Sequence, residues 1–131
     1  IDERIEVIKR RDAYENDHEA FIAHWQSEDA TLRARIVAAR AALADLQTPD
    51  SALRRVAELC IALGSDGLRG ELTLLKAARA FAAFAGDAAV TDDHIRKTAV
   101  LALRHRLRRD PLDDSGSSSR VARKISEILG E

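Results

Sequence analysis

The stretch from Gly64 to Gly86, GSDGLRGELTLLKAARAFAAFAG, decides how this chain folds. It begins as a polar turn in which Gly64, Gly67 and Gly70 recur every third residue. It then becomes an apolar segment that stops at Gly86, the residue type expected just past a helix C-terminus. The pattern predicts a tight turn followed by one long helix.

Arg69 stands where the turn becomes the helix. The first amides of a helix lack partners within it and face the positive end of its dipole, so anions favour this position. A guanidinium adds a planar fork that matches phosphate oxygens. Two interpretations remain open: a helix start that touches a phosphate held by another part of the protein, or a glycine-rich turn with a solvated arginine.

Working outward, helical periodicity and capping residues predict an all-α bundle of about six or seven helices with short connections. No segment alternates as a strand would. The other expected helices are 2–14, 17–25, one capped by Ser27 and reaching Leu46, one begun by Thr48-Pro49 and reaching Leu63, one capped by Thr91 and ending in 104–109, and 121–129.

Each predicted helix has an apolar face that we expect to turn inward. The expected inward residues are Leu32, Ile36, Ala39, Leu43 and Leu46 in the third helix, Leu68, Leu72, Leu75, Ala78, Phe81 and Ala82 in the helix after the turn, Ile95, Ala99, Leu103 and Leu107 in the next, and Val121, Ile125, Ile128 and Leu129 in the last.

The composition of the chain excludes several classes of function. The 131 residues are 46% hydrophobic and carry a net charge of −1, which fits one globular domain and does not imply a nucleic-acid or membrane surface. The single cysteine, Cys60, lies in an apolar run and is expected to be a small buried hydrophobe. The four histidines have no metal-ligand spacing, and no phosphate-binding P-loop is present. We therefore expect neither a metal site nor a catalytic residue in this chain.

Charge is unevenly spread along the chain. Residues 12–29 carry only acidic charges, and residues 96–124 are mostly basic, with a basic hexad at 104–109. These two ends could pair within the domain or between copies, and Arg106 and Arg108 are candidates for a contact between neighbouring subunits.

Three stretches resemble a known family: Leu59–Ala80, Leu103–Asp113 and Ile5–Tyr14. They are similar to the C-terminal helical lid domain of the magnesium chelatase ATPase subunit, the I subunit, a member of the AAA+ ATPases. The resemblance implies that Gly67-Leu68-Arg69-Gly70 is the sensor 2 motif, with Arg69, and less directly Gly67 and Gly70, contacting bound ATP. It also implies that ATP and Mg²⁺ are held mainly by a core that precedes Ile1, so the fragment alone should be inactive.

The same resemblance implies a whole enzyme of the ligase class, which couples ATP hydrolysis to insertion of Mg²⁺ into protoporphyrin IX during chlorophyll or bacteriochlorophyll synthesis. The implied partners are the protein's own AAA+ core, neighbouring I subunits in a ring, the D subunit and, through the complex, the porphyrin-binding H subunit, with no nucleic acid and no membrane span. The location would be the cytoplasm, or the chloroplast stroma in a plant or alga.

We expect a lid domain over 1–112, a flexible Gly/Ser linker over 113–119 and a C-terminal helix over 120–131 that belongs to the same domain. Two alternatives remain at this point. One is the lid of a related AAA+ protein, either a chelatase D subunit or a MoxR-like remodelling ATPase. The other is a non-enzymatic helical interaction module whose acidic and basic ends pair.

Overall fold

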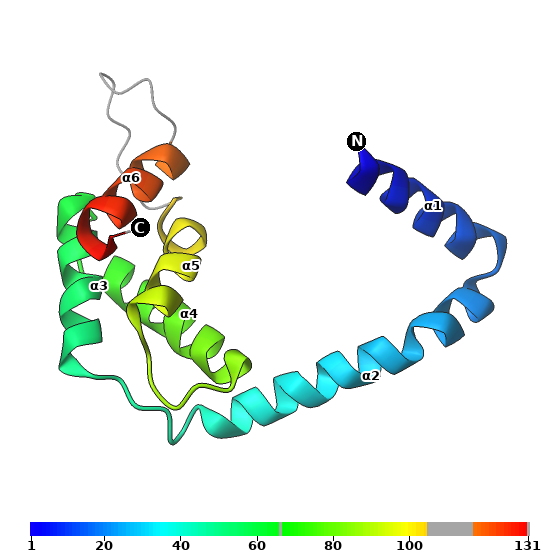
Figure 1. Cartoon of the computed structure of the whole chain (residues 1–131), viewed down its shortest axis with the longest axis horizontal. Helices are drawn as coiled ribbons and strands as arrows, with labels where there is room; N and C mark the ends of the chain where they lie inside the picture. The colour runs from blue at the N-terminus through cyan, green and yellow to red at the C-terminus, as the bar shows by residue number, and fades with distance from the viewer. Residues whose placement is uncertain (66, 105–116, 131) are drawn as a thin grey trace. The chain divides into compact units, whose positions relative to one another are not determined.

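A computed structural model describes residues 1–65, 67–104 and 117–130 of the chain. Figure 1 shows its six helices, which are α1 (Asp2–Asn16), α2 (His18–Ala42), α3 (Asp50–Ala62), α4 (Arg69–Ala85), α5 (Asp92–Leu103) and α6 (Ser117–Leu129). The described residues contain no strand, only an isolated bridge between Gln47 and Ala89. The predicted all-α class is therefore confirmed. The chain divides into two compact units, Ile1–Val37 and Ala38–Glu131, which are described separately below.

The first unit holds α1 and most of α2. The predicted helix start at Asp17 is confirmed within one residue, because the Asp17 carboxylate accepts a hydrogen bond from the Ala20 amide at 3.0 Å. The predicted break at Ser27 is wrong. Ser27 lies inside α2, and its carbonyl accepts the Thr31 hydroxyl at 3.0 Å. A serine can cap a helix, but without proline or glycine nearby nothing prevents the helix from continuing through it.

Aromatic contacts join α1 to α2 near their connection. The rings of Tyr14 and Phe21 meet edge to face at 5.7 Å, and the Arg10 guanidinium lies 4.5 Å from the centre of the Trp25 ring. No residue of α1 is buried. The first unit is consequently held by a few half-exposed contacts rather than by a core.

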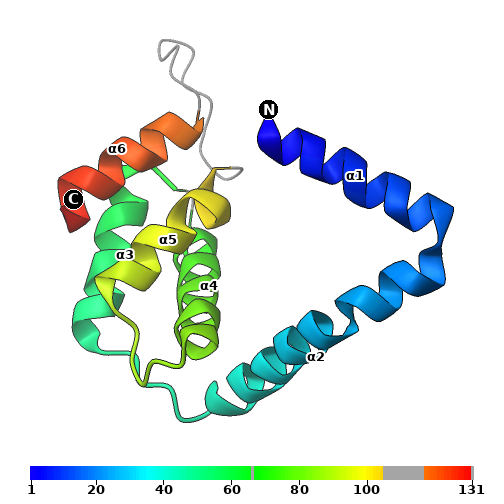
Figure 2. The ribbon, with the colours of Figure 1, turned by 45° about the vertical axis from the view of Figure 1, so that its right-hand side comes forward.

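The second unit is a bundle of α3, α4, α5 and α6, with α5 packed against the other three (Figure 2). Its core is built mostly from leucine, alanine and valine side chains. The largest fully buried residues are Leu59, Leu74, Ile95, Leu103, Val121 and Cys60. A single apolar core therefore unites four helices that come from residues 50 to 129.

The inward face of α4 differs from the predicted one. Leu74, Ala78 and Ala82 are fully buried, whereas Leu68 and Leu72 are 74% and 55% exposed. Gly70 is also buried, and it begins the row that continues through Leu74 and Ala78 at steps of four. Leu72 lies two residues from both Gly70 and Leu74, about 200° around the helix, and so points outward. Ala78 and Ala82 were predicted correctly.

The stripe predicted for the third helix is buried only at its C-terminal end. Ala39 and Leu46 are buried, while Leu32 and Ile36 are 47% and 45% exposed. The bundle of the second unit begins at Ala38, so the two exposed residues fall in the other unit.

The last two helices match their predicted faces. Ile95, Ala99 and Leu103 of α5 are fully buried, as is Val121 of α6, and Ile125 is nearly so. Leu107 and the rest of 105–116 lie outside the described residues. Helix α6 begins at Ser117, four residues before the expected Val121 and inside the range that we expected to be a linker.

Candidate functional site

The turn from α3 to α4 is shaped by glycine at three positions. At the end of α3, Gly64 has a φ of 65°, and the Ser65 amide donates to the Cys60 carbonyl at 3.0 Å. This left-handed glycine and its back-reaching hydrogen bond form a Schellman motif, which ends the helix. Gly67 also has a positive φ, of 62°. Both residues are at conformations that other side chains adopt at a cost.

Gly70 is needed for a different reason. It is buried in the first turn of α4, and a Cβ there would overlap the hydroxyl oxygen of Ser65 and lie 3.2 Å from the Ser65 Cβ. The missing side chain lets the turn fold back onto the start of α4. The predicted contacts of Gly67 and Gly70 with ATP stay predictions, because the structure explains both residues by the path of the backbone.

Arg69 is the first residue of α4, as its position after the turn predicted. Its side chain is exposed, and among the described residues its guanidinium makes no hydrogen bond or ion pair. No side chain in the described part of the chain caps this end of α4. The carbonyl of Arg69 accepts the Thr73 hydroxyl at 2.7 Å. A guanidinium and unpaired amides therefore lie together at an open helix start, which is favourable for an anion.

Two groups near this helix start are shielded from solvent, the carboxylate of Glu71 in part and the thiol of Cys60 completely. Glu71 is half-buried, and one of its carboxylate oxygens is shielded from solvent without a hydrogen-bond partner in the described residues. Cys60 is fully buried, and burial, together with the negative charge of Glu71, raises the pKa of its thiol to about 12. The thiol is thus protonated at neutral pH and is a core residue rather than a nucleophile, as predicted.

Farther along α4, Arg79 reaches across to the connection between α2 and α3. Its guanidinium donates to the Thr48 hydroxyl at 2.6 Å, to the Leu43 carbonyl at 2.9 Å and to the Leu46 carbonyl at 3.5 Å. Thr48 therefore accepts a hydrogen bond from α4 instead of capping α3, which begins one residue after Pro49. The sequence analysis did not predict these contacts of Arg79. Its partners lie 31 to 36 positions away, and no short-range pattern reports such a contact.

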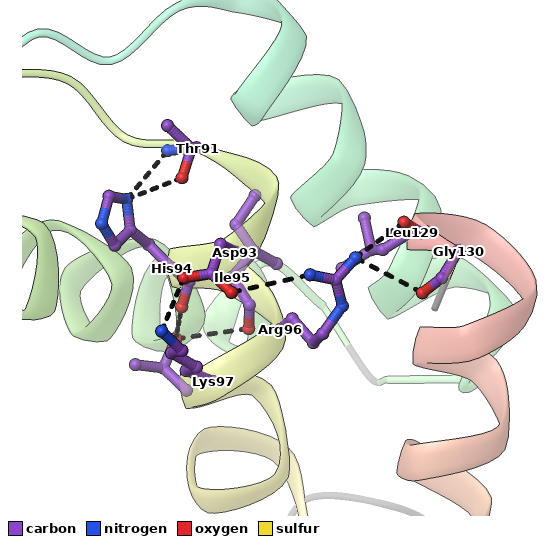
Figure 3. Close-up of polar contacts among 9 residues, drawn as sticks. Thr91, Asp93, His94, Ile95, Arg96, Lys97, Leu129 and Gly130 are labelled. Atoms are coloured by element: carbon purple, nitrogen blue, oxygen red, sulfur yellow. Dashed lines mark hydrogen bonds and ion pairs between the residues drawn. The ribbon is translucent and has the colours of Figure 1, made fainter.

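Polar contacts in the first half of α5 fasten this helix to neighbouring segments on two sides (Figure 3). The Thr91 amide donates to Nδ1 of buried His94 at 3.0 Å, which leaves Nε2 as the nitrogen that donates to the Asp87 carboxylate at 2.9 Å. On the opposite side, Arg96 donates to the carbonyls of Leu129 and Gly130 at 2.9 and 3.3 Å, at the C-terminus of α6.

The His94 contact was visible in the sequence in part. Thr91 was predicted as the cap of α5, and His94 stands three residues later, where a capping-box residue reaches back to the cap amide. The contact of Arg96 with α6 had no sequence signal, because it joins residues 33 positions apart.

The remaining candidates add no second site. In the described residues no group of three His, Cys, Asp or Glu side chains could hold a metal ion. The helices of the described chain are all too short or too polar to cross a membrane. Of the basic hexad, only Arg104 lies in the described part, and Arg106 and Arg108 lie outside it.

The family described as "AAA lid domain" matches residues 53–126, which include α4, α5 and nearly all of α3. The chain belongs to this family. The resemblance drawn from the sequence is therefore confirmed at the level of the domain.

Comparison with individual proteins extends the likeness to the whole chain. The magnesium-chelatase 38 kDa subunit of Cereibacter sphaeroides is 61% identical over 129 residues, 98% of this chain and 39% of that protein. An uncharacterized protein of Mycobacterium tuberculosis is 49% identical over 116 residues, 88% of this chain and 18% of that protein. The chain thus spans about two fifths of the first relative and less than a fifth of the second.

Solved structures are also similar to this chain. One of them is a model of the complex between subunits BchI and BchD of magnesium chelatase from single-particle cryo-EM at 7.5 Å. It is 47% identical and covers 90% of this chain and 36% of that one, with a TM-score of 0.43.

Proposed function

We propose that this chain is the lid domain of the ATP-hydrolysing subunit of a magnesium chelatase, and that Arg69 is its sensor 2 arginine. The observation that carries the proposal is the state of Arg69: exposed, unpartnered among the described residues, and placed at the open N-terminus of helix α4. The 61% identity to a chelatase subunit over nearly the whole chain supports the choice of enzyme.

The residues at this helix start fit a phosphate group. Arg69 offers two parallel N–H donors, and the first-turn amides of α4 add dipolar attraction for a negative charge. Gly70 lets the turn lie close to the start of α4, because any side chain at this position would push Ser65 and the turn away. The neighbouring Glu71 is half-buried, and one of its carboxylate oxygens is shielded from solvent, whereas the Arg69 side chain is exposed.

In the proposed enzyme, ATP is bound by an AAA+ core outside this chain, and cleavage of its terminal phosphate supplies the free energy for metal insertion. The lid contributes one cation to that site. With Arg69 paired to a phosphate, α4 is held against the core. Without that partner the guanidinium has no acceptor, and the lid is free to rotate. We infer that this rotation, in a ring of I subunits joined to the D and H subunits, drives insertion of the substrate Mg²⁺ into protoporphyrin IX.

A chimera tests this proposal directly. Residues 1–131 replace the matching segment of the Cereibacter sphaeroides 38 kDa subunit, and magnesium insertion is followed by porphyrin fluorescence with the other subunits present. We expect the chimera to retain most of the parental rate, and the same chimera with Arg69→Ala to lose it. A folded, ring-forming chimera without chelatase activity would refute the assignment to this enzyme.

A second candidate is the lid of another AAA+ protein. The similarity to the uncharacterized Mycobacterium tuberculosis protein, of which this chain matches less than a fifth, favours keeping it. In that case the chimera would hydrolyse ATP in an Arg69-dependent manner yet insert no magnesium. The two candidates therefore both predict Arg69-dependent ATP hydrolysis, and they differ in whether magnesium is inserted.

A further inference from the structure

We propose that Arg79 is a positioning residue that couples the Arg69 helix to the end of α2, so that α4 and the α2–α3 connection move as one piece. This inference rests on the proposed function, because it concerns how a movement of α4 that begins at Arg69 is transmitted to α2. The two arginines belong to the same helix, ten residues or about 15 Å apart along its axis.

The contacts of Arg79 cover almost the whole connection. Its guanidinium is bonded to Leu43, Leu46 and Thr48, which together span the segment between α2 and α3. Arg79 is half-buried, so these hydrogen bonds are shielded in part from water. A cation that donates to main-chain carbonyls forms stronger bonds than a neutral donor does. One side chain thereby ties three points of the connection to α4.

A second set of bonds ties the same connection to the loop between α4 and α5. The Gln47 amide donates to the Ala88 carbonyl at 2.9 Å, and the Val90 amide donates to the Gln47 carbonyl at 3.0 Å. Leu46 is also buried in the core. The segment 43–48 is therefore fastened to the middle of α4 and to the loop that follows it.

The consequence concerns where the lid can bend. A connection of seven residues between two helices is the usual place for a hinge. Here that place is fixed to α4, so a rotation of α4 must carry the last turn of α2 with it. Helix α2 has 25 residues and extends from the second unit into the first. The movement is therefore delivered to α2 rather than absorbed at its end.

Hydrogen exchange in the full-length AAA+ protein, with and without a non-hydrolysable ATP analogue, tests the coupling. In the unmodified protein the analogue should slow exchange in the first turn of α4, and also at the amides of Leu43, Asp45, Leu46 and Gln47, on the order of tenfold in each. In Arg79→Gln we expect the α4 response to remain and the response at 43–47 to fall below about twofold.

Milder variants keep the test usable if Arg79→Gln disturbs folding. Thr48→Val removes the shortest contact at nearly constant volume and should weaken the response at 43–47, while Arg79→Lys should restore part of it. Arg96→Gln is the matched control, because Arg96 is also a half-buried arginine that donates to two carbonyls, but at α6. It should leave both responses intact.

Two results would overturn the inference, and they differ. In one, Arg79→Gln raises exchange at 43–47 by the same factor with and without the analogue. The tenfold response to the analogue then survives, and Arg79 stabilises the connection without coupling it to Arg69. If the first turn of α4 does not respond to the analogue even in the unmodified protein, the proposed role of Arg69 fails as well.

Discussion

The hydroxyl of Ser65 occupies the space that a side chain on Gly70 would need. This contact folds the turn back onto α4 and sets where Arg69 emerges. We expect Gly70→Ala to lower the free energy of unfolding by about 1–3 kcal/mol, the usual cost of forcing an extra methyl into a packed site. Urea unfolding followed by circular dichroism measures the change.

A double-mutant cycle separates this steric effect from other costs. Ser65→Gly should recover much of the stability lost in Gly70→Ala, because it removes the atoms that the new methyl meets. Gly67→Ala is the comparison: among the described residues no atom beyond its chain neighbours lies within 4 Å of the added Cβ, yet its φ of 62° should still cost about 1 kcal/mol. Independent, additive effects of Ser65→Gly and Gly70→Ala would show that the two residues do not collide.

His94 should contribute strongly to the stability of the second unit. His94→Ala removes a buried ring, the acceptor of the Thr91 amide and the donor to Asp87. We expect the midpoint of urea unfolding to fall by an amount equivalent to about 2–4 kcal/mol, which combines a cavity with an unpaired amide. His94→Gln, which can reach back to the Thr91 amide as a capping box does, should cost less. Equal losses in both variants would argue against the cap.

Burial of Cys60 gives the stability a dependence on alkaline pH. The pKa of its thiol is raised from 9.0 to about 12 in the folded chain. Between these values the unfolded chain releases the thiol proton while the folded chain keeps it, so the free energy of unfolding falls as pH rises above about 9. The slope attributable to Cys60 is up to about 1.4 kcal/mol per pH unit. Comparison with Cys60→Ala isolates this share, and identical slopes in the two proteins would rule it out.

The two units should differ in local stability when the 131-residue chain is studied alone. Helix α1 buries no side chain, whereas α4 buries Leu74, Ala78 and Ala82 completely. We therefore expect amides of α1 to exchange close to the free rate, and those in the middle of α4 to exchange about 10³-fold more slowly. Mass spectrometry of exchanged peptides gives both values. Matching protection in α1 and α4 would contradict the expectation that burial sets the local stability of these helices.

The sequence predicted the local features of the fold more reliably than the contacts between segments. Gly86 ends α4 with a φ of 85°, and the start at Thr91 and the faces of α5 and α6 were found because each depends on residues within one or two turns. The break at Ser27 was wrong because a capping residue permits a helix start without requiring one. The face of α4 was misassigned because Gly70, which sets it, packs against Ser65 and Cys60 rather than following the leucine pattern.

The position of Arg69 at a helix start could be predicted from the sequence, but the long-range contacts that hold α4 in the bundle could not. The glycine turn predicted that Arg69 begins α4, since a helix start after such a turn is a local event, whereas its proposed contact with ATP rests on the family resemblance. The contacts of Arg79 were not predicted, because they depend on Thr48 and Leu43 being brought beside α4 by the packing of the bundle.

The most direct test of the proposal is the ATP turnover of the full-length protein with Arg69→Ala. Loss of one charged donor that acts at the phosphate should lower kcat by about 10²-fold or more. Arg54→Ala, which removes another exposed arginine on the neighbouring helix α3, should leave kcat unchanged. If the Arg69→Ala protein assembles normally and turns over ATP as fast as Arg54→Ala, Arg69 does not sense the nucleotide.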